Sequence, residues 1–432
     1  MSKEFGKYVR GGPPDEEKFD TSLPPVLPKR YLLPLVWAGS YAMQLLHRGR
    51  VHKVGMDGLK PPYLLLCNHS SFYDYYTLFT ATFPHRGIYP SAADDFIGRE
   101  QLLRKLGAIP KRKFATDIGL VRHCRRTLAA GRIFGIYPEA RYSLCGQTEQ
   151  IPRAAGQLAK RMGVPVVTLR ACGNHLYDPF WSDHRARRVV PMEAVMTQIY
   201  TSQSLEAATP EEIGAKIEAY LDQDDFRWQS ENRIRISYRK RAEGLHKPLY
   251  QCPHCMREFE MRSAGAQLFC DACGKSWTLS EYGGLLADNG ETEFKFITDW
   301  YKWEREQVRD EVRRGDYRFD CAVDVNDLPN ARGFVHMGRG RLVHDLGGFR
   351  LEGIRDHDGE PFCMDLPARA QAAVHIEYSY RYGGHRDCID LSTIEDTRYA
   401  FPEGQRFSVT KISLATEEIY RYLSEGGTRH DG

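Results

Sequence analysis

A histidine and a carboxylate stand close together in the first part of this sequence. His69 and Asp74 have four residues between them and follow the apolar run from Tyr63 to Cys67. An apolar run of this length before a turn is typical of a buried strand, so the pair is predicted to lie at a strand end. An imidazole that is oriented by a carboxylate can take a proton from a hydroxyl group. The spacing therefore indicates a general base with its orienting partner.

An acid and a guanidinium follow a second apolar run. Glu139 and Arg141 come shortly after the run from Ile133 to Ile136, which also predicts a strand. A guanidinium group binds phosphate or carboxylate oxygens in pairs. The sequence thus places a proton acceptor and an anion-binding group at the ends of two strands.

Four segments resemble the motifs of the glycerolipid acyltransferase family, which includes the 1-acylglycerol-3-phosphate acyltransferases. They occur in the family's order, and 70 positions separate His69 from Glu139, a spacing that the family shows. The likeness covers about residues 50–200. The chain departs from it at Ala140, where the family usually has glycine, and at Arg141, which is one position closer to Glu139 than usual. The four segments are His69–Asp74, Gly107–Arg112, Pro138–Arg141 and Val164–Val167.

This resemblance implies a reaction and the residues that perform it. A fatty acyl group is expected to move from acyl-CoA or acyl-carrier protein to the free hydroxyl of 1-acylglycerol-3-phosphate. By resemblance, His69 is the general base and Asp74 accepts the other N–H of its ring. Backbone N–H groups at the same turn are expected to stabilise the oxyanion. The phosphate subsite of the acceptor is implied to contain Arg112, Glu139, Arg141 and, where the family usually has lysine, Arg153.

Three alternatives stay open. The shifted position of Arg141 leaves glycerol 3-phosphate or another lysophospholipid as the acceptor. Glu139 and Arg141 can also form an internal ion pair beside any role in binding. A different class of function is a non-catalytic lipid- or partner-binding protein that retains the acyltransferase fold.

Two Cys-x2-Cys pairs with fourteen residues between them predict a zinc ribbon. Four thiolates at this spacing can surround one Zn²⁺ tetrahedrally, and Gly274 after the second pair allows the tight turn of such a knuckle. No open coordination position is implied, so the metal is expected to be structural. Disulfides are the alternative, which a reducing cytosolic setting disfavours. The predicted ligands are Cys252, Cys255, Cys270 and Cys273.

The pattern of runs predicts several units. Alternating strand-like and helix-like runs indicate an α/β acyltransferase domain, a mixed sheet flanked by helices. Short alternating runs near the end, followed by one helix, indicate a mainly-β, barrel-like domain similar in layout to pleckstrin-homology domains. The expected order is a flexible tail (1–30), an interfacial helix (31–50), the acyltransferase domain (51–204), a helical connector (205–249), the zinc ribbon (250–282), a linker helix (296–315) and the β-rich domain (316–426).

The apolar stretch from Tyr31 to Leu46 is flanked by basic residues on both sides. As a helix it spans about 24 Å, less than the roughly 30 Å of a bilayer's hydrocarbon core. We therefore expect it to lie in the headgroup region, although a helix that only covers the catalytic domain is the alternative. The protein is expected in the cytoplasm, peripherally associated with the cytoplasmic face of the membrane.

Composition limits the remaining choices. A chain of 432 residues with 42% hydrophobic content can bury more than one core. The net charge of +3 is nearly neutral, which argues against a nucleic-acid partner. The zinc ribbon and the β-rich domain are expected instead to dock a protein partner or a lipid headgroup.

Overall fold

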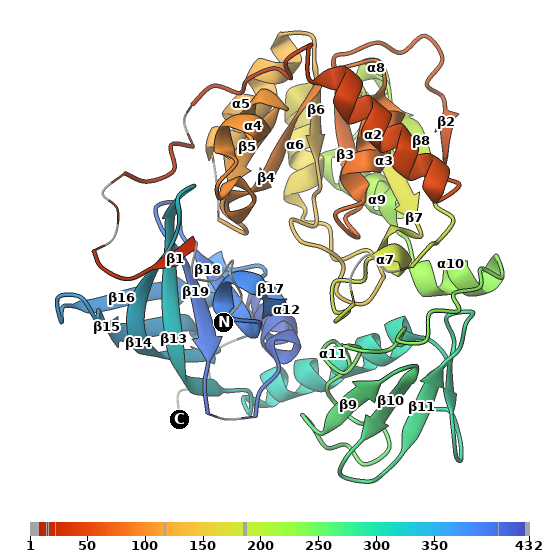
Figure 1. Cartoon of the computed structure of the whole chain (residues 1–432). Coiled ribbons are helices and arrows are strands. Elements are labelled where there is room, and N and C mark those ends of the chain that lie inside the picture. Colours follow the sequence, from red (N-terminus) through yellow and green to blue (C-terminus); the bar gives the residue numbers. More distant parts are fainter. Residues whose placement is uncertain are drawn as a thin grey trace.

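The computed structural model describes residues 8–427 except 14, 16, 22, 116–117, 185–187 and 405. Within these residues the chain forms three sheets, of seven, four and eight strands. Figure 1 shows the α/β part at the top, the small sheet at the lower right and the large antiparallel sheet at the lower left. The predicted α/β part and the β-rich C-terminal part are therefore confirmed as classes of structure.

The seven-stranded sheet builds the α/β unit, our name for residues 50–200. Its strands are β2 (Arg50–Val54), β3 (Tyr63–Cys67), β4 (Gly87–Ala92), β5 (Ala108–Lys111), β6 (Ile133–Ile136), β7 (Val166–Cys172) and β8 (Glu193–Tyr200). The spatial order is β2, β8, β7, β3, β6, β4 and β5. From β7 to β5 all pairs are parallel, whereas β8 is antiparallel to β7. The sheet is mixed, as the sequence predicts.

The central strand β3 is buried on both faces. Leu64 and Leu66 belong to the apolar core on one face of the sheet, and Tyr63 and Leu65 to the core on the other. A continuous apolar run is what a strand covered on both faces requires. The helices of this part are α2 (Leu33–Leu46), α3 (Asp74–Thr82), α4 (Glu100–Lys105), α5 (Ile118–Ala129), α6 (Ala154–Met162) and α7 (Asn174–Tyr177).

Three helices connect the α/β unit to the rest of the chain: α8 (Ser202–Ala207), α9 (Pro210–Leu221) and α10 (Asp225–Glu231). Thr209 caps α9 and forms a capping box with Glu212. α9 packs closely on α6, where a Cβ at Gly156 would lie 2.2 Å from the carbonyl oxygen of Pro210. The connector is thereby held against the catalytic sheet.

The small sheet contains β9 (Met261–Ala264), β10 (Gln267–Cys270), β11 (Ser276–Leu279) and β12 (Leu285–Ala287), all antiparallel. It is followed by α11 (Ile297–Arg314), which ends at Gly315 with φ of 77°. The rings of Trp277 and Trp300 meet edge to face at 4.8 Å between centroids. The predicted linker helix therefore packs on the small sheet.

The large sheet and the last helix form the C-terminal unit, our name for residues 316–427. The spatial order is β16, β15, β14, β13, β19, β18 and β17, with antiparallel neighbours. The helix α12 (Val409–Ser424) packs against β17 and β18. The strands are β13 (Phe319–Asn330), β14 (Gly333–Asp345), β15 (Gly348–Ile354), β16 (Pro361–Pro367), β17 (His375–Tyr380), β18 (Arg386–Ser392) and β19 (Thr397–Pro402). Its similarity to a pleckstrin-homology domain stays a prediction from this layout.

The N-terminal segment, which we expected to be a flexible tail, lies against the C-terminal unit in its described residues. The short strand β1 (Val9–Arg10) pairs in parallel with β14. Phe19 is buried, and its backbone N–H donates to the carbonyl oxygen of Pro329 at 2.8 Å. The segment thus adds to the large sheet.

The parts of the chain share one apolar core. Side chains of the α/β unit such as Trp181, of the small sheet such as Trp277, of α11 such as Trp300 and of the C-terminal unit such as Ile376 belong to one contiguous cluster of buried residues. Because an apolar core of this kind excludes water between the parts, each part contributes to the stability of the others.

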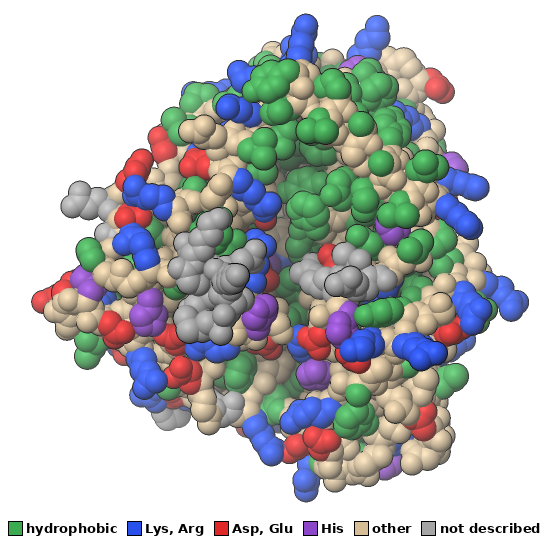
Figure 2. All heavy atoms as spheres, viewed as in Figure 1, with side chains coloured by type: hydrophobic (Ala, Val, Ile, Leu, Met, Phe, Trp, Pro, Cys, Tyr) green, Lys and Arg blue, Asp and Glu red, His purple; other side chains and the backbone are tan. Residues whose placement is uncertain are grey.

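The surface of α2 is apolar. Leu35 and Leu45 are 76% and 82% exposed, and Tyr41 and Leu46 are also exposed. Figure 2 shows hydrophobic side chains gathered over the region where Figure 1 places α2 and α3. Among the helices described, none is both long enough and apolar enough to cross a membrane.

Candidate active site

Polar side chains collect at the carboxyl-terminal edge of the parallel strands. His69 follows β3, Asp94 follows β4, Lys113 follows β5, Glu139 follows β6 and Asn174 follows β7. Because these strands are parallel neighbours, their carboxyl ends meet at one edge of the sheet. Five segments that are far apart in the sequence therefore meet around His69.

His69 and Asp74 form a hydrogen-bonded pair. Nδ1 of His69 lies 2.8 Å from Oδ2 of Asp74. The helix α3 begins at Asp74, so the turn before it places His69 outside the helix and lets the two side chains meet. The side chain of Asp74 is 3% exposed and that of His69 is 15% exposed. A buried carboxylate in this position keeps the proton on Nδ1 and leaves Nε2 to accept one.

Asp74 is held by donors that the sequence analysis did not assign to it. The backbone N–H groups of Ser70 and Ser71 donate to Oδ2 at 2.7 and 3.1 Å, and Nδ2 of Asn174 donates to Oδ1 at 2.6 Å. The position of Asn174 directly after a strand that neighbours β3 is the signal that could have found it. The expectation that these turn amides stabilise an oxyanion is wrong for Ser70 and Ser71, because Asp74 already accepts their N–H groups.

The ring of His69 lies between two tyrosine rings. The centroid of Tyr137 is 4.0 Å away at an interplanar angle of 24°, and that of Tyr142 is 4.3 Å away at 50°. Aromatic faces attract cations, so an imidazolium that forms on proton transfer is stabilised here. Tyr137 and Tyr142 flank Glu139 and Arg141 in the sequence. The segment that contains Glu139 and Arg141 therefore also supplies the two rings that enclose His69.

Glu139 ties the two motifs together. Its Oε1 accepts the backbone N–H of His69 at 2.6 Å, and its Oε2 accepts that of Glu149 at 2.7 Å. Burial raises the pKa of Glu139 well above its ordinary value, although the two N–H donors act in the opposite direction. Both oxygens are used by backbone donors, so this side chain positions the loop of the base; it does not aim the arginines.

Arg141 is buried between carboxylates. Its Nη2 lies 2.7 Å from Oε2 of Glu149 and 2.5 Å from Oε1 of Glu417, while Nη1 donates to Oγ of Ser413 at 2.6 Å. Burial would lower the pKa of Arg141, but the two carboxylates outweigh it and raise the pKa above its ordinary value. The internal ion pair that the sequence left open exists, with Glu149 and Glu417 in the place of Glu139.

The other two arginines of the implied phosphate subsite do not line the cavity that lies beside His69. Nη1 of Arg112 donates to the carbonyl oxygen of Ile394, in the turn between β18 and β19. Arg153 is exposed at the start of α6.

A cavity of about 150 Å³ lies beside His69. Of the residues that the sequence singled out, His69 and Arg141 line it, whereas Glu139, Arg112 and Arg153 do not. Residues that the sequence analysis did not single out also line it: Asp94, Asp95, Lys111 and Lys113 from the α/β unit, and His375 and Glu377 from β17.

Comparison with known families agrees with this geometry. The family model for acyltransferases matches residues 48–171. This segment is an acyltransferase domain. The match covers β2 to β7 and includes both motifs of the catalytic edge.

Solved structures with a similar fold are also found. The chain is similar to the 1-acyl-sn-glycerophosphate (LPA) acyltransferase PlsC from Thermotoga maritima, at 18% identity and a TM-score of 0.35. The similarity covers 44% of this chain and 77% of that one. No curated protein matches the sequence.

The four predicted zinc ligands lie together. The sulfur atoms of the four cysteines all lie within 4.8 Å of one another. Two similar turns present them, since the N–H of Met256 donates to the carbonyl of Cys252 and that of Gly274 to the carbonyl of Cys270, both at 2.9 Å. Four converging thiols at the tips of two turns fit a tetrahedral metal ion. The cluster is Cys252, Cys255, Cys270 and Cys273.

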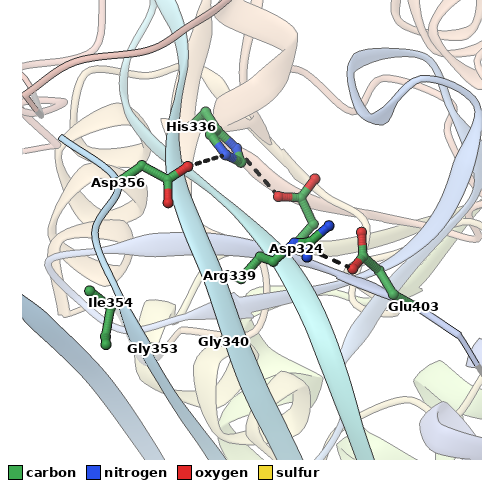
Figure 3. A pocket seen from close by; sticks show the side chains of 8 residues that line it. All are labelled: Asp324, His336, Arg339, Gly340, Gly353, Ile354, Asp356 and Glu403. Carbon is green, nitrogen blue, oxygen red and sulfur yellow. Dashed lines mark hydrogen bonds and ion pairs between the residues drawn. The ribbon is translucent and has the colours of Figure 1, made fainter. Parts of the chain in front are cut away.

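A second, open cavity lies on the C-terminal unit (Figure 3). Nε2 of His336 lies 3.2 Å from Asp356 and Nδ1 lies 3.4 Å from Asp324, while Arg339 lies 3.8 Å from Glu403. Arg339 and Asp356 are mostly exposed, at 84% and 64%. The charged groups of this cavity pair with one another at the surface, and none of them belongs to the acyltransferase domain.

Proposed function

We propose that this protein is an O-acyltransferase that moves a fatty acyl group from a thioester to a hydroxyl of a lysophospholipid-type acceptor. The observation that carries the proposal is the pair of His69 and Asp74, hydrogen-bonded at 2.8 Å beside a cavity of an acyltransferase domain. His69 and Asp74 lie within the residues that the family model matches, and His69 lines the cavity.

The reaction follows from the orientation of the ring. Nε2 of His69 has no protein partner among the described residues, and the ring lines the cavity. Nε2 takes the proton of the acceptor's hydroxyl as its oxygen attacks the thioester carbonyl, and the imidazolium is stabilised by Asp74. The C–S bond then breaks, and the departing thiolate takes the proton. Acyl-CoA and acyl-carrier protein are both donors with this chemistry.

The acceptor is the finer part of the proposal. The family resemblance makes 1-acylglycerol-3-phosphate the reference acceptor, which would make the product phosphatidate. Glycerol 3-phosphate or another lysophospholipid is the alternative. One observation favours the alternative: Arg141, the arginine of the implied phosphate subsite that lines the cavity, already pairs with Glu149 and Glu417.

The apolar surface of α2 supports peripheral binding to the cytoplasmic face of a membrane. Its exposed leucines and Tyr41 would be buried in the lipid when the helix binds a membrane surface. Trp37 and Tyr41 both contact the ring of Phe83, at 4.7 and 5.9 Å between centroids, so the helix is fixed to the acyltransferase domain near α3. Membrane binding through α2 would thus bring the cavity to its lipid substrate.

The cysteine cluster supports a structural zinc site. Residues next to the first knuckle are held by α11, since Oε1 of Glu304 accepts the N–H of Gln251 at 2.8 Å and the Trp300 indole donates to the Gln251 carbonyl at 2.9 Å. A bound Zn²⁺ would fix both knuckles against this helix. The ribbon then serves as a brace and, together with the C-terminal unit, as a place for a protein partner.

The test is acyl transfer by the purified full-length protein. Acyl-CoA or acyl-carrier protein is incubated with 1-acylglycerol-3-phosphate, and the product is identified by mass spectrometry. His69→Ala is expected to lower the rate at least about 100-fold, because a general base contributes about 10²–10⁴. His52→Ala, at an exposed histidine on β2, is the matched control. Retention of more than a few per cent of the rate by His69→Ala would exclude the base, and absence of product with all donors and acceptors would favour the non-catalytic class.

A further inference from the structure

The cavity beside His69 is closed by the C-terminal unit. His375 and Glu377 on β17 line it together with residues of the acyltransferase domain. Contacts across this boundary are specific: Tyr380 Oη donates to Oδ2 of Asp94 at 2.9 Å, and Nζ of Lys113 donates to Oε1 of Glu377 at 3.2 Å. The substrate space is therefore formed jointly by the two parts of the chain.

Lys113 is surrounded by carboxylates from both sides. Its Nζ lies 3.4 Å from Asp94, 3.2 Å from Glu377 and 3.7 Å from Asp390. Burial would lower the pKa of Lys113, but these carboxylates outweigh it and raise the pKa above its ordinary value. The ammonium group is thus charged, but three carboxylates already surround it. Their negative charges offset its attraction for an anionic ligand.

Arg141 is compensated in the same way. Glu149 comes from the loop that follows the second motif, and Glu417 comes from α12. Glu417 also pairs with Arg305 at 2.5 Å, so the network continues into α11. A guanidinium group whose N–H groups already donate to buried carboxylates cannot also bind a phosphate bidentately.

The charge that remains at the cavity wall is negative. Three carboxylates line the cavity, Asp94, Asp95 and Glu377, and so do three cations, Lys111, Lys113 and Arg141. The excess of negative charge comes from acids outside the lining, since Arg141 also pairs with Glu149 and Glu417, and Lys113 with Asp390. Lys111 donates to the carbonyl oxygen of Ala115 at 3.0 Å. Asp95 accepts the hydroxyl of Ser91 at 2.6 Å and lies 3.7 Å from Nη2 of Arg99, which is half-exposed at the surface.

Three polar atoms of residues that line the cavity are buried and have no hydrogen-bond partner among the described residues: Oδ1 of Asp94, Nδ1 of His375 and Oη of Tyr137. The side chain of His375 is 5% exposed. Buried polar atoms normally have partners, and a carboxylate oxygen needs a donor. A hydroxyl or ammonium group supplies such a donor, whereas an ionised phosphate does not.

We propose that β17 of the C-terminal unit completes the acceptor site and that Asp94, Asp95 and Glu377 select an acceptor whose polar group is uncharged or carries an ammonium group over one that ends in a phosphomonoester. This inference rests on the proposed function, since it concerns the acceptor of that reaction. A phosphomonoester brings about 1.5 to 2 negative charges to a wall that is already acidic.

The experiment compares three acceptors with the full-length protein and one acyl-CoA. They are 1-acylglycerol, which is uncharged, 1-acylglycerophosphoethanolamine, which carries an ammonium group, and 1-acylglycerol-3-phosphate, all in mixed micelles of the same neutral detergent. We expect kcat/KM for one of the first two to exceed that for the phosphomonoester at least about tenfold. A preference for the phosphomonoester overturns the inference but leaves the proposed function intact. Failure of all three acceptors overturns the proposed function itself.

Glu377→Gln tests the role of the C-terminal unit. The amide retains the size and one acceptor but removes the charge, so kcat/KM for the phosphomonoester relative to the uncharged acceptor is expected to rise about threefold to tenfold. Asp95→Asn, on the acyltransferase side, is expected to act in the same direction. Glu360→Gln, at an exposed turn of the same unit, is the matched control and leaves the ratio unchanged. Equal changes for all acceptors in both variants would overturn the inference.

Discussion

The backbone N–H of His69 donates to Oε1 of Glu139 at 2.6 Å, which joins two motifs that are 70 positions apart in the chain. The other oxygen of Glu139 accepts the N–H of Glu149, whose own carboxylate holds Arg141. His69 is thus connected, through the side chains of Glu139, Glu149 and Arg141, to the ion pairs that involve the C-terminal helix α12. Packing of the C-terminal unit and orientation of His69 are parts of one network.

Substitutions of Asp74 and Asn174, the residues that orient His69, should lower kcat without preventing the acceptor from binding. Asp74→Asn is expected to lower kcat about 10²–10⁴-fold, because the ring loses its oriented acceptor. Asn174→Ala removes the donor to the other oxygen of Asp74, and we expect kcat to fall about tenfold with little change in KM. Steady-state kinetics with the best acceptor measure both effects. Asn232→Ala, at an exposed asparagine after α10, is the control, and a KM effect equal to the kcat effect in Asn174→Ala would contradict an orienting role.

Arg141→Ala should lower the stability of the fold as well as the acyltransferase activity. Removing the guanidinium leaves Glu149 and Glu417 buried with less compensation, and breaking a buried ion pair costs about 3–5 kcal/mol. Urea unfolding followed by fluorescence measures the loss. Arg125→Ala, at an exposed position of α5, should change the free energy of unfolding by less than about 0.5 kcal/mol. A fully stable Arg141→Ala protein with a raised KM would return Arg141 to a role in acceptor binding.

Metal analysis tests the cysteine cluster. The purified protein is expected to contain about one zinc ion per chain, and Cys252→Ser should lose most of it, because three thiolates hold Zn²⁺ more weakly than four. The melting temperature should fall at the same time, since the small sheet shares an apolar core with α11. Cys363→Ser, at an exposed cysteine of β16, is the control. Zinc at full occupancy in Cys252→Ser would show that the metal is bound elsewhere.

Acid should weaken the contact that Glu377 makes. Burial would raise the pKa of Glu377, but Lys113 and His375 outweigh it and lower the pKa from 4.5 to about 2. A carboxyl group whose pKa is lower in the folded state stabilises the fold above its unfolded pKa, and the stabilisation disappears as pH falls from about 4.5 to about 2. The difference in free energy of unfolding between the wild type and Glu377→Gln should therefore be about 1–3 kcal/mol at pH 6 and shrink below pH 4.5. A difference that does not vary with pH would contradict the ionised contact.

Local patterns allowed much of the structure to be predicted. The strands around Tyr63–Cys67 and Ile133–Ile136, the capped start of α9 at Thr209 and the end of α11 at Gly315 follow from neighbouring residues, and all were found. The final helix begins at Val409, where Ser408 caps it by accepting the backbone N–H of Lys411. The strands β4 and β5 were not predicted, since each contains a proline, Pro90 and Pro110, and proline within a run argues against a strand.

The sequence by itself determined the two side-chain groups on which the proposed chemistry rests, because His69 and Asp74 meet across a single turn and each pair of cysteines spans one knuckle. The geometry of such contacts is fixed by the backbone angles of a few neighbouring residues, so local sequence is enough to predict them. The tertiary structure alone decided the partners of the cations: Arg141 meets Glu417 across 276 positions, and Lys113 meets Glu377 across 264. Pairings at these separations depend on how an α/β sheet and an antiparallel sheet pack on each other, and that packing is set by the shared apolar core, not by any local pattern.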